Sequence, residues 1–92
     1  MITVDISSIS RDNLGIISRA IYWLNNNQDE WYEMESRTNR YKDIVIIYNW
    51  FLDNNIKNVS FYNGHILEFD DEKSANLFRI RILVYFKMKN VQ

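Results

Sequence analysis

The sequence predicts a small α+β domain, in which helices cover one face of an antiparallel sheet. In some segments apolar residues alternate with polar ones, which is typical of half-buried strands. In others they recur every three or four residues, which is typical of amphipathic helices. With 92 residues, of which 47% are hydrophobic and 15% aromatic, the chain is expected to form a single domain over residues 1–92 around a thin core.

The chain opens with an expected strand over residues 2–6, because apolar side chains at every second position define one face. Ser10 is a suitable N-cap for the helix that follows. Apolar residues then recur at helical spacing, and this helix is expected to end at the asparagines 25–27. The residues of this apolar stripe are Leu14, Ile16, Ile17, Ala20, Ile21, Trp23 and Leu24.

The middle of the chain predicts a second strand and a second helix. Residues 31–37 are β-prone and carry carboxylates at Glu33 and Glu35, which indicates a strand with one solvated face. Residues 40–54 include the β-branched run 44–47, yet their length and polar end favour a helix. The apolar residues at helical spacing in this second helix are Tyr41, Ile44, Tyr48, Phe51 and Leu52.

A β-hairpin is expected at Asn63-Gly64, because both residues tolerate the positive φ of a tight turn. Its register is open at this stage. A two-residue loop pairs Phe61 with Ile66, whereas a three-residue loop pairs Phe61 with Leu67. The second register gives the cleaner apolar face.

The last part of the chain predicts a capped helix and then a strand. The acidic residues 70–72 supply a cap and negative charge for a helix N-terminus. Residues 79–89 alternate apolar and basic, which favours a strand, although no turn residue separates Phe78 from Ile80. One continuous helix is therefore the alternative. In the strand, Ile80, Ile82, Val84, Phe86 and Met88 would share one face.

The expected order is strand, helix, strand, helix, hairpin, helix and strand. Without the helix at 40–54, this order is the split βαβ (ferredoxin-like) plan, so the full prediction is that plan with an extra helix. The sequence contains neither a Pro/Gly/Ser-rich linker nor an internal repeat, so no domain boundary is expected.

The composition argues against an enzyme. The chain has no cysteine, one histidine, His65, and two glycines, so thiolate metal sites, multi-histidine zinc sites and glycine-rich phosphate loops are excluded. A metal-dependent hydrolase would have to use Glu33, Glu35 and the acidic residues 70–72, which a solvated strand face and a helix cap explain more simply. We expect no catalytic residue, no metal and no cofactor.

A basic pattern in residues 79–89 is the candidate binding site. If this segment is a strand, its basic side chains project from one face with Tyr85 between them as a stacking platform for nucleic acid. Eleven basic and 12 acidic side chains give a net charge of −1, which disfavours non-specific binding to nucleic acid. The candidate partner-binding or nucleic-acid-binding residues are Arg79, Arg81, Tyr85, Lys87 and Lys89.

One resemblance bears on the origin of the chain. Residues 64–79, Gly-His-Ile-Leu-Glu-Phe-Asp-Asp-Glu-Lys-Ser-Ala-Asn-Leu-Phe-Arg, form an apolar segment followed by an acidic one with Ala and Phe. This stretch is similar to small uncharacterised accessory proteins of T4-like tailed bacteriophages, and it implies a viral accessory protein without catalytic residues. The composition, with 13 isoleucines and 12 asparagines, is typical of translation from an AT-rich genome, which many such phages and many bacteria have.

These observations predict a small non-enzymatic binding protein. We expect it to dock onto a host or anti-phage defence protein complex and to inhibit or modulate it, with abundant aromatic residues as interface anchors. Nucleic-acid binding is the alternative, and a homodimer is also open. Asp5 stands where a signal peptide would carry positive charge, and no apolar run is long enough to span a membrane, so we expect the host cell cytoplasm.

Overall fold

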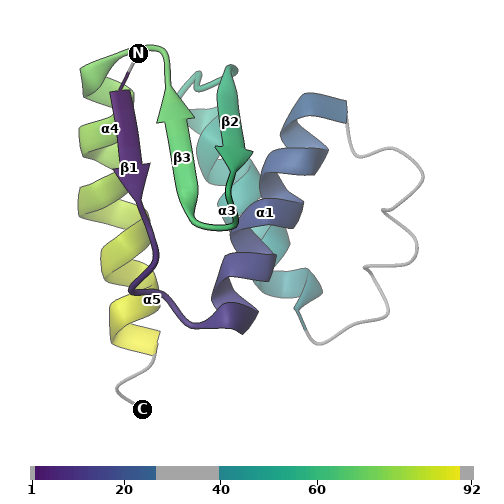
Figure 1. Cartoon of the computed structure of the whole chain (residues 1–92). Coiled ribbons are helices and arrows are strands. Elements are labelled where there is room, and N and C mark those ends of the chain that lie inside the picture. Colours follow the sequence, from purple (N-terminus) through teal and green to yellow (C-terminus); the bar gives the residue numbers. More distant parts are fainter. Residues whose placement is uncertain (1, 27–39, 90–92) are drawn as a thin grey trace.

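The computed structural model describes residues 2–26 and 40–89 (Figure 1). In these residues, one antiparallel sheet is packed on one side by helices, which confirms the α+β class. The strands are β1 (Ile2–Asp5), β2 (Val59–Tyr62) and β3 (Ile66–Phe69). The helices are α1 (Arg11–Asn26), α3 (Tyr41–Asp53), α4 (Glu72–Phe78), the π-helix η1 (Arg79–Leu83) and α5 (Val84–Lys89).

The sheet has the strand order β1-β3-β2, and both pairs are antiparallel. Because β1 and β2 flank β3 and run in the same direction, the described strands follow the split βαβ arrangement. In the hairpin, Phe61 pairs with Leu67, so the register with the three-residue loop is confirmed. Asn63 and Gly64 have φ values of 56° and 78°, the left-handed conformation that this turn requires.

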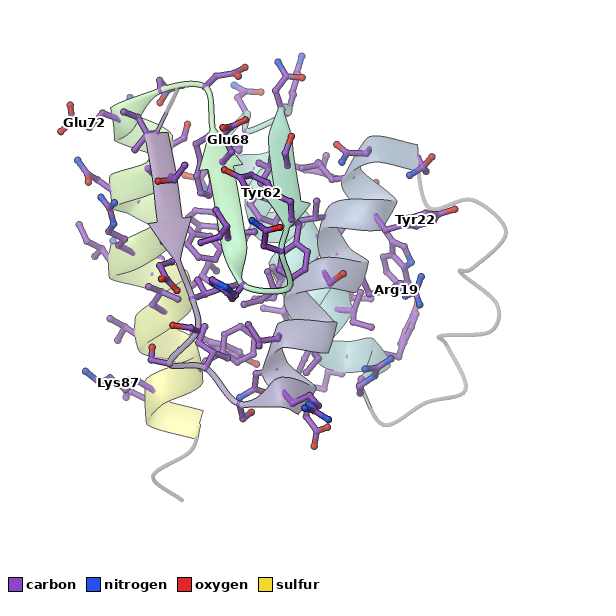
Figure 2. All side chains as sticks on the ribbon, in the orientation of Figure 1. Arg19, Tyr22, Tyr62, Glu68, Glu72 and Lys87 are labelled. Atoms are coloured by element: carbon purple, nitrogen blue, oxygen red, sulfur yellow. The ribbon has the colours of Figure 1, made fainter. Side chains whose placement is uncertain are left out.

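The hydrophobic core lies between the sheet and the helices. Val4, Val59 and Leu67 are buried on the inner face of the sheet. The opposite side of the sheet is solvated, and Figure 2 shows Tyr62 and Glu68 on this side. The largest fully buried side chains are Trp23, Phe51, Phe69, Phe78 and Phe86.

The helices expected from the first half of the chain are confirmed. Ser10 caps α1, because its Oγ accepts a hydrogen bond from the backbone N–H of Asn13 at 3.4 Å. The β-branched run 44–47 is helical, and Ile44 and Ile47, three residues apart, are both buried in α3. The expected strand at 31–37 lies outside the described residues.

The cap expected at residues 70–72 is also confirmed. The Asp71 side chain accepts a hydrogen bond from the backbone N–H of Ser74 at 2.7 Å, and α4 begins at the next residue, Glu72. This hydrogen bond to the carboxylate lowers the pKa of Asp71.

The strand expected at 79–89 is wrong: this segment is helical. It continues α4 without interruption through η1 and α5. A strand would need a reversal of the chain after Phe78, where no turn residue is present, whereas a continued helix keeps the backbone N–H and C=O groups paired. The place beside β1 that the expected strand would take in the split βαβ plan is not filled by another described strand.

Candidate binding surface

The C-terminal helical segment, residues 72–89, has apolar side chains on two opposite sides. Phe78, Ile82 and Phe86 are buried in the core, with exposed fractions of 0%, 3% and 1%. The residues halfway between them along the chain point away from the core, because a step of two residues crosses to the other side of a helix. We call this side the outer face; its exposed apolar residues are Ile80, Val84 and Met88.

The exposure of the outer face is large. Ile80 is 61% exposed and Met88 is 68% exposed, more than any other large apolar residue in the described part of the chain. These residues were expected to share one apolar strand face with Ile82 and Phe86, whereas the structure places them on the opposite side of a helix. An apolar stripe that the core does not need is a typical mark of an interaction surface.

A π-helical turn lies in the middle of this segment. In η1 the backbone hydrogen bonds join residues five apart, so the turn is wider than an α-helical one. Ile80 and Val84, which are four residues apart across this turn, therefore lie nearly above one another on the outer face. Such turns are frequent at functional sites.

A groove runs along one edge of the outer face. Its volume is about 360 Å³, and it lies between the segment that follows β1 and the C-terminal helix. Its described lining includes two cationic side chains, Arg79 and Lys87, and contains no carboxylate. The lining residues are Ser8, Ile9, Arg79, Leu83, Val84, Phe86 and Lys87.

Arg79 is held in place by two hydrogen bonds. Its Nη1 donates to Oδ1 of Asn76 at 2.8 Å, and its Nη2 donates to the backbone carbonyl of Thr3 at 3.2 Å. In the described sheet, β1 pairs with β3 alone. The guanidinium of Arg79 therefore donates its hydrogen bond to a carbonyl on the free edge of β1. Arg79 thus joins the edge strand to the helix and covers part of that edge.

Tyr85 is engaged with α3 instead of being available as a stacking platform. Its hydroxyl donates to Oδ1 of Asp43 at 2.7 Å. Burial, followed by this hydrogen bond and the negative charge of Asp43, raises the pKa of Tyr85 to about 12. The ring is partly buried and lies edge-on to Phe86 at 5.2 Å between centroids.

Of the five candidate residues from the sequence, the four whose side chains are described are not gathered on one face. Arg79 and Lys87 line the groove, Arg81 is exposed outside it, and Tyr85 contacts Asp43. Lys89 ends α5, and its side chain lies outside the described residues. Sequence reasoning missed the outer face, although the same alternation that favoured a strand would have revealed it once the segment was taken as a helix.

Two of the acidic residues 70–72 have structural roles. Asp70 accepts a hydrogen bond from Nδ2 of Asn58 at 2.8 Å, and Asp71 caps α4. Glu33 and Glu35 lie outside the described residues. Within residues 2–26 and 40–89, no group of three histidine or acidic side chains is placed to hold a metal ion.

His65 lies beside the hairpin turn, with its Nδ1 3.4 Å from Oδ1 of Asp5. Both side chains are well exposed, at 42% and 60%. The Asp5 carboxylate accepts a hydrogen bond from the backbone N–H of Ser7, which is the main cause of its lowered pKa. A weak, solvated pair of this kind offers no nucleophile or base in a closed site.

Comparisons of the chain with protein-family models, with curated proteins and with solved structures found no match. Among the described helices, none combines the length and the apolar character needed to cross a membrane. The candidate surface therefore has to be interpreted from its own geometry.

Proposed function

We propose that the protein is a small non-enzymatic binding protein that docks onto a protein partner through the outer face of its C-terminal helix. The observation that carries this proposal is the exposure of Ile80, Val84 and Met88 on one stripe, beside a groove with basic residues at its edge. Apolar anchors surrounded by polar side chains are the usual composition of a protein interface.

We further propose that the chain is a bacteriophage accessory protein that inhibits or modulates a host or anti-phage defence complex in the cytoplasm of the infected cell. The resemblance of residues 64–79 to accessory proteins of T4-like phages favours this origin, and so does the composition rich in isoleucine and asparagine. A small helical face that fits into a groove of a larger protein suits such a role.

Nucleic-acid binding is the alternative proposal, and the geometry favours it less. Of the candidate residues whose side chains are described, only Arg79 and Lys87 share the groove, and the hydroxyl of Tyr85 donates a hydrogen bond to the carboxylate of Asp43. Tracking a phosphate backbone requires a longer row of cations, and each neutralised phosphate adds to the salt dependence of binding.

A binding experiment tests the docking proposal. The immobilised protein is expected to retain a specific protein from a nuclease-treated lysate of host bacteria, and Val84→Asp is expected to reduce retention at least about tenfold, because a buried carboxylate without a partner is costly. Val84 is 45% exposed, so the variant should fold.

The matched control is Leu52→Asp, which changes a residue of similar exposure, 47%, on α3. This variant is expected to retain the partner as the unmodified protein does. Equal retention by Val84→Asp and the unmodified protein would contradict docking through the outer face. Retention from an untreated lysate that is absent from the nuclease-treated one would favour the nucleic-acid alternative.

A further inference from the structure

We infer that in the free protein the outer face is covered by a second copy of the chain, and that the two C-terminal helices pack against each other in antiparallel orientation. This inference goes beyond the proposed function. It concerns the same surface but rests on separate observations: the regular four-residue spacing of the exposed row along the helix and the distribution of charge between its ends.

The exposed residues of the outer face repeat every four positions along the whole helix. Ile80 lies at the centre of this row. A two-fold axis beside Ile80 brings this residue against its own copy, and it places Val84 against Asn76 and Met88 against Glu72 of the second copy. Antiparallel helices that cross at a small angle, about 20°, contact each other along their length. The complete row is Glu72, Asn76, Ile80, Val84 and Met88, all of them exposed.

The charges of the helix favour the antiparallel orientation. The helix starts after two acidic residues with Glu72, which Lys73 follows, and its second half carries basic side chains without an acidic one, among them Arg81 and Lys87. Figure 2 shows that Glu72 and Lys87 project from the same side of the helix, near its opposite ends. In the antiparallel pair, Glu72 of each copy lies beside Lys87 of the other, whereas a parallel pair would bring like charges together.

The overall electrostatic repulsion between the two copies is small, because the net charge of each chain is only −1. A helix over residues 72–89 is about 27 Å long. One helix pair of this length buries an area at the low end of specific interfaces, so we expect a reversible dimer with a dissociation constant on the order of micromolar.

Sedimentation equilibrium of the full chain, from about 1 µM to about 1 mM, tests the dimer. The unmodified protein is expected to pass from monomer to dimer across this range. Ile80→Glu is expected to raise the dissociation constant at least about tenfold, because two carboxylates would meet at the two-fold axis. Leu52→Glu on α3 is the matched control and is expected to dimerise normally. A monomer at every concentration would overturn the inference.

A charge exchange tests the orientation. Glu72→Lys alone and Lys87→Glu alone are each expected to raise the dissociation constant about tenfold, since the changed pair occurs twice in a two-fold dimer. The double variant is expected to restore dimerisation. If the double variant is as weak as either single one, the antiparallel pairing is wrong. Circular dichroism shows whether each variant is folded.

The two proposals fail in different ways. A protein that is monomeric throughout but loses its lysate partner on Val84→Asp would overturn the dimer and leave the docking function intact. A dimer that is abolished by Ile80→Glu, in a protein that retains no partner, would support the inference and contradict the proposed function.

Discussion

Replacing Phe78 with alanine is expected to remove a large share of the free energy of unfolding of the protein. Phe78 is fully buried, and its ring lies 5.5 Å from that of Phe69 and 6.2 Å from those of Phe51 and Trp50, measured between centroids. Removing a buried phenylalanine side chain costs about 3 to 5 kcal/mol. Since a domain of this size has a free energy of unfolding of only about 5 to 14 kcal/mol, the loss removes a large share of it.

The measurement is chemical denaturation followed by tryptophan fluorescence, with thermal unfolding alongside. A loss of this size lowers the melting temperature by roughly 15 to 30 °C. Phe78→Leu, which keeps most of the apolar volume, is the control and should cost only about 1 to 2 kcal/mol. If Phe78→Ala were as stable as the control, Phe78 would not join α4 to the sheet and α3 as described.

The second large effect is a contrast between two neighbouring isoleucines. Ile82→Ala is expected to reduce the free energy of unfolding by about 2 to 4 kcal/mol, because Ile82 is buried and a cavity would remain. Ile80→Ala is expected to change it by no more than about 0.5 kcal/mol, because Ile80 is 61% exposed. The two residues differ by two positions and carry the same side chain.

Each isoleucine variant is the control for the other, since chemistry and local helix propensity are matched. Urea denaturation under conditions where the protein is monomeric gives both values, and it keeps self-association out of the comparison. Equal losses in the two variants would place both side chains on the same buried face. That is the arrangement of the strand expected from the alternation, and it would contradict the helix.

Local signals in the sequence predicted most of the described fold correctly. The positive φ values of Asn63 and Gly64, the cap at Asp71 and the cap at Ser10 are properties of a few neighbouring residues. The register of the hairpin also followed from its own pattern, because the three-residue loop puts Phe61 beside Leu67 on the buried face. Such short-range preferences act before any tertiary contact is made.

The C-terminal segment could not be assigned from local signals. From residue 78 to residue 88, every second residue is apolar, so the same residues fit one face of a strand or two opposite faces of a helix. The choice depends on the contacts of Phe78, Ile82 and Phe86 with the core, and on the absence of turn residues after Phe78. Tertiary packing therefore overrides the periodicity.

The candidate site in the structure differs from the one expected from the sequence for the same physical reason. A strand would have gathered the basic residues on one face and buried Ile80, whereas the helix distributes the charges and exposes the apolar stripe. The candidate binding residues are therefore the apolar ones of the outer face. Of the basic residues, Arg79 and Lys87 lie at the edge of this face. The proposals on docking and on the second copy both depend on this division of the apolar residues.

Thiol labelling tests this division of the apolar residues most directly. Because the chain contains no cysteine, the labelling rate of a variant with one introduced cysteine reports on that position alone. Single cysteines at positions 80, 82, 84, 86 and 88 are labelled under native conditions at low protein concentration. The structure predicts rapid labelling at 80, 84 and 88 and strong protection at 82 and 86, since labelling of a buried thiol requires local opening. Similar protection at all five positions would contradict the outer face.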